Sequence, residues 1–223
     1  MSNVLVIAPH PDDETLGCGG TLLNHTSKGD KINWLIMTSN EDSSSYSKEE
    51  KENQKKSIEK VRNIFSFDDV HQCSFPTSYL DSIPKIEIIR EISTFLNKTK
   101  PEILYLPFAN DAHSDHGEVF EAALSCTKSF RYPFIKKIRV YETLSETNFN
   151  INPSKTSFEP NLFIDISVFL EKKIEIMNLF EGEILDHPFP RSEESIKAMA
   201  ILRGSVAGCK YAESFMSLKE VLD

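Results

Sequence analysis

The hydrophobic and polar positions of this chain follow one another in blocks that are typical of alternating strands and helices. Short, mostly apolar runs cover residues 4–8, 32–38, 70–75, 103–106, 138–141 and 162–166. Longer segments with apolar residues at helical spacing cover residues 15–28, 48–65, 84–98, 116–129, 168–180 and 193–202. Short apolar runs predict buried parallel strands, and the longer spacing predicts amphipathic helices.

The order of these elements predicts a single α/β domain over residues 1–223 with a doubly wound, Rossmann-like fold. We expect a mostly parallel sheet of about five or six strands flanked by helices. No repeat, linker or change of composition divides the chain, and its 223 residues are enough for one large domain.

Charge and cysteine spacing narrow the class of protein. The net charge of −9 argues against nucleic acid as a partner, because a phosphate backbone requires a surface rich in lysine and arginine. We expect neither a signal peptide nor a stable membrane anchor, since no suitable apolar or polybasic run occurs. Four widely spaced cysteines without a Cys-x-x-Cys pair favour reduced thiols and a cytoplasmic location: Cys18, Cys73, Cys126 and Cys209.

Two clusters of ionisable residues each follow a predicted strand. The first is His10-Pro11-Asp12-Asp13-Glu14 and the second is His113-Ser114-Asp115-His116. Such dense charge at the end of a buried strand is costly unless a partner neutralises it, and a divalent metal is the simplest partner. Ligands of open parallel sheets bind beyond the carboxyl ends of the strands, so we expect both clusters to build one site.

The side chains in these clusters are sufficient for a hydrolytic metal site. A catalytic zinc ion takes three protein ligands and keeps one open position. Hydrolysis also requires a carboxylate base and a proton donor. The clusters supply three histidines and four acidic residues, but their spacing alone does not assign the roles.

The first cluster closely resembles the Ala-His-Pro-Asp-Asp-Glu signature of the PIG-L/LmbE-like deacetylases. The second is similar to their His-x-Asp-His motif, and residues 204–215 look like the C-terminal segment of that family. The resemblance spans nearly the whole chain. It implies one deacetylase domain that uses a metal to remove acetyl groups from N-acetylglucosamine units.

The resemblance also implies individual roles. Zn²⁺ would be bound by His10, Asp13 and His116, and Fe²⁺ also suits a set of two histidines and one carboxylate.

For catalysis, the resemblance implies that Asp12 is the general base that activates the attacking water. His113 would face the developing oxyanion, and Asp115 would orient His113.

Two residues are candidates for contact with the substrate. Glu41 resembles a family glutamate that contacts sugar hydroxyls. Arg191 either contacts an anionic part of the substrate or forms a salt bridge within its loop.

This chain departs from the family pattern only in its substrate-facing part. Asn40 replaces a glycine, Gln54 and Ser57 replace an arginine and a glutamate, and residues 76–78 replace Pro-Asp-Gly. This distribution favours retained chemistry on a different acceptor.

Three functional hypotheses follow. The first is a zinc-dependent N-deacetylase of a small amino-sugar substrate, free or in a conjugate. The second keeps the metal but hydrolyses another amide or N-acyl group. The third is a non-catalytic glycan-binding module, against which the presence of Asp12 and His113 argues.

A plain helix N-cap is the structural alternative for Asp12 and Asp13. The substrate's identity and the biological pathway stay open, as does the oligomeric state, with which a homo-oligomer is compatible.

Overall fold

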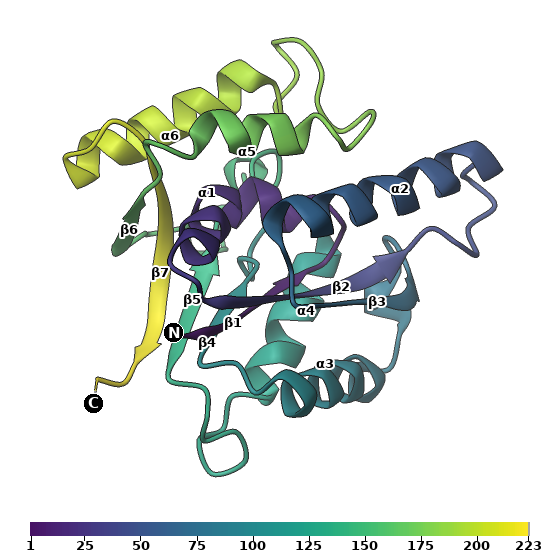
Figure 1. Ribbon diagram of the computed structural model, residues 1–223. Coiled ribbons are helices and arrows are strands. Elements are labelled where there is room, and N and C mark those ends of the chain that lie inside the picture. The colour runs from purple at the N-terminus through teal and green to yellow at the C-terminus, as the bar shows by residue number, and fades with distance from the viewer. Residues whose placement is uncertain (223) are drawn as a thin grey trace.

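The computed structural model describes residues 1–222 and contains one seven-stranded sheet with helices on both faces (Figure 1). Residue 223, the end of the domain expected over 1–223, lies outside the described residues. The strands are β1 (Asn3–Ala8), β2 (Lys31–Ser39), β3 (Asp69–Pro76), β4 (Ile103–Leu106), β5 (Lys137–Tyr141), β6 (Leu162–Asp165) and β7 (Ala212–Glu220). The helices are α1 (Asp13–Ser27), α2 (Lys48–Phe65), α3 (Lys85–Thr99), α4 (Ser114–Ser125), α5 (Leu170–Met177) and α6 (Glu193–Ala207), with 3₁₀ turns η1 (Leu80–Ser82) and η2 (Thr147–Phe149).

The strand order is β3-β2-β1-β4-β5-β7-β6. The first five strands are parallel and have the order of a doubly wound sheet, as the alternating pattern predicts. The last two strands pair antiparallel, β7 with β5 and β6 with β7. The expectation of five or six strands was therefore too low, and the sheet is mixed.

The strand that the sequence pattern missed is β7. Glu213 and Ser214 are buried within it and interrupt the apolar run that marks the other strands. The Glu213 carboxylate accepts hydrogen bonds from the backbone N–H groups of Gly20 and Thr21 and from the Lys173 ammonium. A buried polar strand position depends on such distant partners, and a local pattern cannot reveal them.

Several helix ends also differ from the predicted ones. α6 extends five residues beyond the predicted end at 202 and stops where Gly208 adopts a left-handed conformation (φ 77°). α4 ends at Ser125 instead of 129, and α5 ends at Met177 instead of 180.

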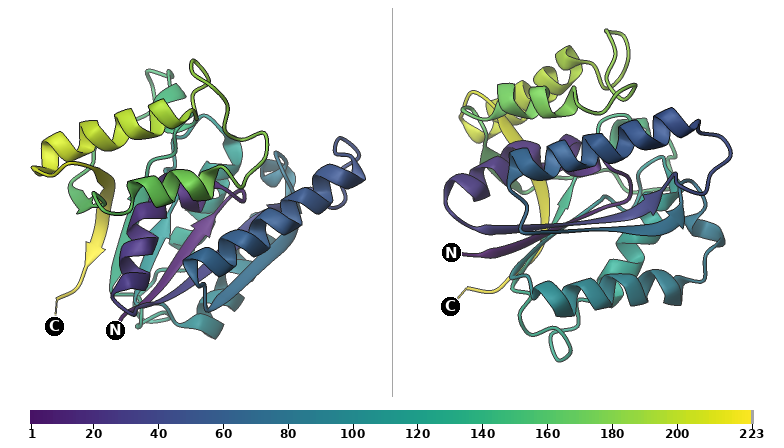
Figure 2. Two further views of the ribbon diagram at one scale, coloured as in Figure 1. Left: turned by 45° about the horizontal axis from the view of Figure 1, so that its top comes forward. Right: turned by 45° about the vertical axis from the view of Figure 1, so that its right-hand side comes forward.

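The core lies in two layers, one on each side of β1. Val4, Val6 and Ala8 face a cluster that includes residues of α1 and α2, whereas Leu5 and Ile7 face residues of α3 and α4. Two views of the fold show α1, α2, α5 and α6 on one side of the sheet and α3 and α4 on the other (Figure 2). This double burial explains why β1 is entirely apolar from Val4 to Ala8.

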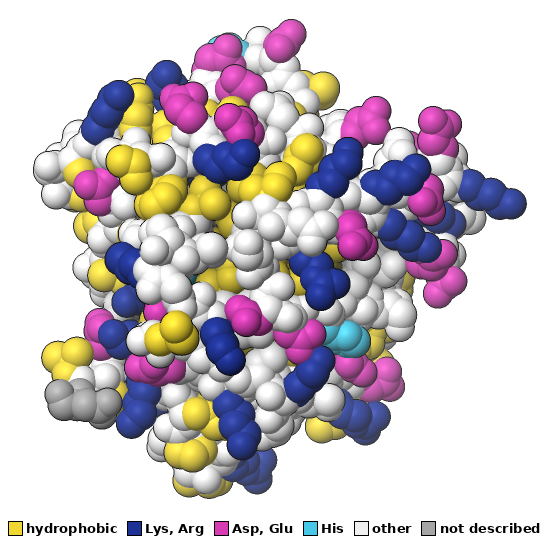
Figure 3. Space-filling view, viewed as in Figure 1, with side chains coloured by type: hydrophobic (Ala, Val, Ile, Leu, Met, Phe, Trp, Pro, Cys, Tyr) yellow, Lys and Arg dark blue, Asp and Glu magenta, His cyan; other side chains and the backbone are white. Residues whose placement is uncertain are grey.

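The surface of α2 is charged along its exposed side. Lysine and glutamate side chains lie next to one another there (Figure 3). The helix begins with a capping box, in which the Ser47 hydroxyl accepts from the Glu50 N–H and the Glu50 carboxylate accepts from the Ser47 N–H.

Among residues 1–222, no helix is both long and apolar enough to cross a bilayer.

Breaking the pair formed by Lys173 and Glu213 is expected to lower the stability of the fold strongly. Its N–O distance is 2.7 Å, both side chains are buried, and it joins α5 to β7 and α1. Glu213→Gln leaves the Lys173 ammonium buried without its carboxylate, and breaking such a pair costs about 3–5 kcal/mol. Denaturant unfolding monitored by circular dichroism measures the change.

Glu175→Gln is the matched control for this prediction. It breaks the pair of Glu175 with Lys172 on the same helix at the same 2.7 Å, but both of these side chains are exposed. An exposed pair contributes less than about 1 kcal/mol. Equal losses of stability in the two variants would contradict the prediction.

Candidate metal centre and active site

The two ionisable clusters meet at one edge of the sheet. β1 and β4 are neighbouring parallel strands, so the segments that follow Ala8 and Leu106 leave the sheet side by side. The ring centroids of His10 and His113 lie 4.5 Å apart, and those of His10 and His116 lie 5.5 Å apart. Residues from two distant parts of the sequence therefore form one site.

His10, Asp13 and His116 form a set of donors suited to one cation. Their ligand atoms lie within 4.8 Å of one another. Asp13 Oδ2 is 3.4 Å from His10 Nδ1 and 3.4 Å from His116 Nε2. His116 Nε2 is buried and has no hydrogen-bond partner, which a buried ring nitrogen normally requires. A cation bound between these three side chains would supply that partner.

Asp111 fixes the orientation of His116. Its Oδ2 lies 2.7 Å from His116 Nδ1, and its Oδ1 accepts a 2.6 Å hydrogen bond from the Thr147 hydroxyl. A carboxylate on one ring nitrogen directs the other nitrogen toward a metal and makes it a stronger ligand. Asp111 lies outside both sequence motifs, which therefore predict no role for it. Its position five residues before His116, within the same charged segment, was the available signal.

The electrostatics of this set already favour positive charge between the three side chains. Burial disfavours the charged form of His10, but Asp115 and Asp13 outweigh it and raise its pKa to about 9. Burial has the same effect on His116, yet Asp13 and Asp111 raise its pKa well above the ordinary value. The pKa of Asp13 is held well below its usual range because the two imidazoles outweigh burial. A divalent cation would supply here the positive charge that the neighbouring carboxylates favour.

Asp12 occupies a strained position beside this set. Its φ of 141° is unfavourable for a residue with a side chain, and its carbonyl accepts the N–H groups of Thr15 and Leu16 at the start of α1. Asp12 makes no side-chain cap hydrogen bond, so an N-cap does not explain it. Burial and neighbouring Asp13 raise the pKa of Asp12 well above its usual range, and Arg191 opposes this rise.

Arg191 holds Asp12 in place. Its Nη1 donates to Asp12 Oδ2 at 2.8 Å and to Glu183 Oε2 at 2.6 Å. Of the two roles expected for Arg191, the structure contains the salt bridge. Because one guanidinium nitrogen is shared by two carboxylates, much of its charge is balanced within the protein.

Glu14 is fully buried and supports the turn that carries Asp12. It accepts hydrogen bonds from the Asp12 N–H and the Thr15 hydroxyl. Burial raises its pKa to about 8.

His113 and Asp115, from the second cluster, also lie in this site. Asp115 Oδ2 is 3.0 Å from His10 Nε2 and 4.0 Å from His113 Nδ1, so the carboxylate contacts His10 instead of His113, the partner expected for it. The His113 Nδ1 atom accepts the Asp115 backbone N–H. A neutral His113 therefore carries its proton on Nε2, which lies 3.2 Å from the Ser78 hydroxyl.

A second possible donor set, His10, His113 and Asp115, is already satisfied by hydrogen bonds. Asp115 accepts the N–H groups of Ser78 and Leu80 in addition to its contact with His10. The set with the unpartnered His116 nitrogen is therefore the better metal site.

These side chains open into a cavity of about 200 Å³. It is lined by His10, Pro11, Asp12, Asp13, Asn40, Tyr46, Gln54, Thr77, Ser78, His113, Thr143, Glu146, Glu183 and Arg191. Asn40, Gln54, Thr77 and Ser78 belong to the segments that depart from the family pattern. Glu41, an expected substrate contact, does not line this cavity: it is half exposed and forms a 2.6 Å salt bridge with Lys55.

Comparison with known proteins agrees with this geometry. The family model of GlcNAc-PI de-N-acetylase, PIG-L, matches residues 5–127. Diacetylchitobiose deacetylase of Thermococcus kodakarensis is 24% identical over 224 residues, which cover 96% of this chain and 82% of that protein.

Solved structures share the fold over the whole chain. The conserved protein TT1542 of Thermus thermophilus superposes with a TM-score of 0.78 and 26% identity, covering 100% of this chain and 97% of that one. N,N'-diacetylchitobiose deacetylase of Pyrococcus horikoshii, complexed with its inhibitor MPG, superposes with a TM-score of 0.77 and 20% identity, covering 97% and 83%. The family match spans more than half of the chain and includes both ionisable clusters, so the chain belongs to the PIG-L family of metal-dependent N-deacetylases.

Proposed function

We propose that this protein is a zinc-dependent hydrolase that removes the N-acetyl group from an N-acetylated amino sugar of the N-acetylglucosamine type. The observation that carries the proposal is the buried, unpartnered His116 Nε2, which faces Asp13 beside a carboxylate held by Arg191. The Thermococcus kodakarensis relative, a diacetylchitobiose deacetylase, supports the choice of an amino sugar. We assign the activity to one domain over residues 1–223 acting in the cytoplasm.

His10, Asp13 and His116 would hold the metal in this proposal. When bound, Zn²⁺ would lower the pKa of a water molecule and polarise the acetyl carbonyl. Two imidazoles and one carboxylate also suit Fe²⁺, so the donor set does not distinguish between the two metals.

Asp12 would take the proton from the attacking water. Its carboxylate lines the cavity, and Arg191 holds one oxygen at 2.8 Å. The arginine fixes the direction of the carboxylate, so the free lone pairs face a narrow range of water positions. The proton held by Asp12 can then pass to the amine nitrogen as the carbon–nitrogen bond breaks.

His113 would donate a hydrogen bond to the oxygen of the acetyl carbonyl as negative charge develops on it. The backbone N–H of Asp115 occupies its Nδ1, which leaves the Nε2 proton directed away from the helix. Ser78, which lies 3.2 Å from this Nε2, supports the ring from the β3–η1 segment. A donor fixed before the reaction stabilises the oxyanion without reorganisation.

A hydrolase of another amide or N-acyl group is the second candidate. In this proposal the metal centre would contact only the acyl group and the water, so the same side chains would suit a formyl group. Hydrolysis rates measured on a panel of N-formyl, N-acetyl and N-propionyl glucosamine separate the two candidates.

Removing the metal is expected to abolish turnover. Dialysis against a chelator should release one divalent ion per chain, and added Zn²⁺ should restore N-acetylglucosamine hydrolysis. Elemental analysis and released acetate measure the two quantities. Full activity of the metal-depleted protein would disprove the proposed mechanism.

Asp12→Asn is expected to lower kcat by about 10²–10⁴-fold, because it removes the proton acceptor but keeps the shape of the side chain. Metal content should stay at one ion per chain. Asp42→Asn, in the exposed loop after β2, is the control and should keep wild-type activity. An unchanged kcat in the Asp12 variant would rule out this residue as the base.

Asp111→Asn is expected to weaken metal binding by about 10–100-fold, because His116 loses the carboxylate that orients it. Competition with a fluorescent zinc chelator gives the affinity. Asp81→Asn, at an exposed position in η1, provides the comparison. Matching affinities for the two variants would show that Asp111 does not act through the metal.

A further inference from the structure

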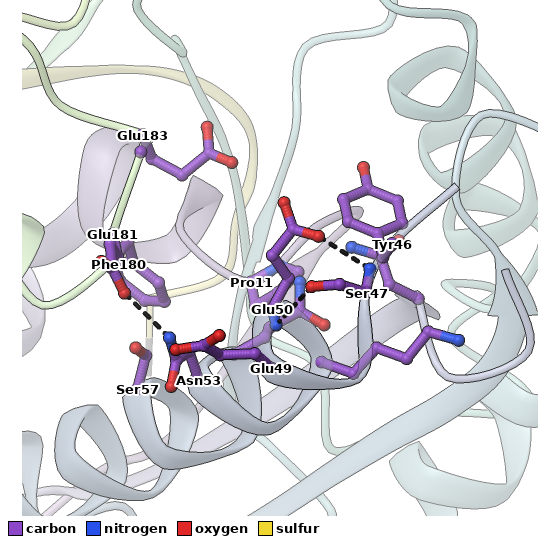
Figure 4. A pocket seen from close by; sticks show the side chains of 14 residues that line it. Pro11, Tyr46, Ser47, Glu49, Glu50, Asn53, Ser57, Phe180, Glu181 and Glu183 are labelled. Carbon is purple, nitrogen blue, oxygen red and sulfur yellow. Dashed lines mark hydrogen bonds between the residues drawn. The ribbon is translucent and has the colours of Figure 1, made fainter. Parts of the chain in front are cut away.

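Three metal-ligating side chains lie together outside the cavity of the proposed active site. They are His71 and Cys73 from β3 and Glu91 from α3, and we call them the β3–α3 cluster. None of the three lines that cavity or the larger groove of about 470 Å³ beside it, between the start of α2 and the segment after α5 (Figure 4). The proposed deacetylase activity therefore gives this cluster no role.

The fold itself brings these groups together. Alternate residues of a strand point to the same face of the sheet, so His71 and Cys73 both face the layer that contains α3. The His71 ring stacks on Phe95 of α3, with centroids 5.8 Å apart and an interplanar angle of 23°. Glu91 lies one helical turn before Phe95 and faces the same imidazole. An imidazole nitrogen, the Cys73 sulfur and a carboxylate oxygen all lie within 4.8 Å of one another.

His71 and Glu91 are separated like two ligands of one ion. Their Nε2 and Oε2 atoms are 3.6 Å apart, which is too long for a hydrogen bond. Zinc–ligand bonds of about 2.0–2.3 Å place the ligands of a tetrahedral ion about 3.3–3.8 Å apart. Both side chains are partly exposed, so they can rotate to close around an ion that also contacts the sulfur.

The Cys73 thiol has no other partner. It is free and buried, and within residues 1–222 it makes no hydrogen bond, whereas the thiols of Cys126 and Cys209 donate to backbone carbonyls. Burial and Glu91 raise the pKa of Cys73 to about 12, so the thiol is protonated and unreactive without a cation. A metal ligates the thiolate, so its binding would release this proton to water.

We propose that His71, Cys73 and Glu91 form a second metal site, selective for Zn²⁺ over Mg²⁺ and Ca²⁺. A thiolate and an imidazole favour zinc, whereas the harder cations require oxygen ligands. The three side chains and one water molecule would complete a tetrahedron around the ion. This inference does not depend on the proposed deacetylase activity.

Zinc in the β3–α3 cluster would join β3, an edge strand of the sheet, to α3. These two elements flank the segment that carries Ser78, which lies beside His113. The cluster is more exposed than the set of His10, Asp13 and His116, so it should bind zinc more weakly. Protein dialysed against metal-free buffer should therefore hold one ion per chain, and a second ion should bind on titration with Zn²⁺.

Co²⁺ tests the site by spectroscopy, because it accepts the same ligands as Zn²⁺. A Co²⁺–thiolate bond produces a charge-transfer band in the near ultraviolet, and the donor set of the proposed active site contains no thiol. Protein with two equivalents of Co²⁺ should show this band, and added Zn²⁺ should remove it. A Co²⁺ titration without the band would overturn the inference.

Substitutions identify the ligands. Cys73→Ser should abolish the band, whereas Cys209→Ser, at a less buried cysteine, should keep it. His71→Ala changes a partly exposed side chain and serves as the second variant if Cys73→Ser folds poorly. It should weaken zinc binding at the cluster about 100-fold or more, because a lost ligand costs at least as much as a lost orienting partner. A band that persists in Cys73→Ser would disprove the assignment.

Thermal unfolding gives a readout that does not require cobalt. With the first site filled, zinc at about 100 times the Kd of the cluster should raise Tm by a further 5 °C or so. Glu91→Gln should lose most of this rise, and Glu87→Gln, an exposed position on the same helix, should keep it. Equal rises in these two variants would refute the role of Glu91 as a ligand and with it the site.

Discussion

The close packing of three successive buried carboxylates is the constraint on which this site depends. Asp12, Asp13 and Glu14 are each almost inaccessible to solvent, and like charges at such short range cannot all be ionised without partners. Each of the three carboxyl groups is stabilised in a different way. Asp12 pairs with Arg191, Asp13 lies between two imidazoles, and Glu14 has a raised pKa and accepts local hydrogen bonds. The partners come from distant segments, so satisfying the charges also joins those segments.

Sequence patterns predicted the parallel part of the fold well because its central strands, β1, β2 and β4, are buried on both faces. The apolar run of β1 and the helical spacing of α2 are local properties that any window of the chain reveals. β7 was missed because its buried Glu213 is stabilised by Lys173 and by the backbone of Gly20, which lie 40 and 193 residues away along the chain. Polar residues that are buried for a distant partner look like surface residues in the sequence.

The site was predicted to a similar extent. The motifs identified side chains that meet in the candidate metal site, since these lie in two short runs that follow neighbouring strands. The contacts that orient them were less visible. Asp111 belongs to neither motif, and Asp115 was expected beside His113, although its carboxylate contacts His10. Such pairings depend on side-chain directions at the ends of two strands, and a residue type at a given spacing does not determine them.

The proposed catalytic groups follow strand ends, whereas the lining of the neighbouring groove comes from connecting segments. This separation affects how such enzymes can change their substrates. The groups that we propose to act on the acetyl unit follow the ends of β1 and β4, at the centre of the sheet, where a change of position disturbs both core layers. The neighbouring groove is lined by the start of α2 and by the segment after α5, which lie at the periphery and are more exposed. Mutation can therefore alter the choice of acceptor while leaving the reaction intact, so a lineage can acquire new substrates without passing through an inactive ancestor.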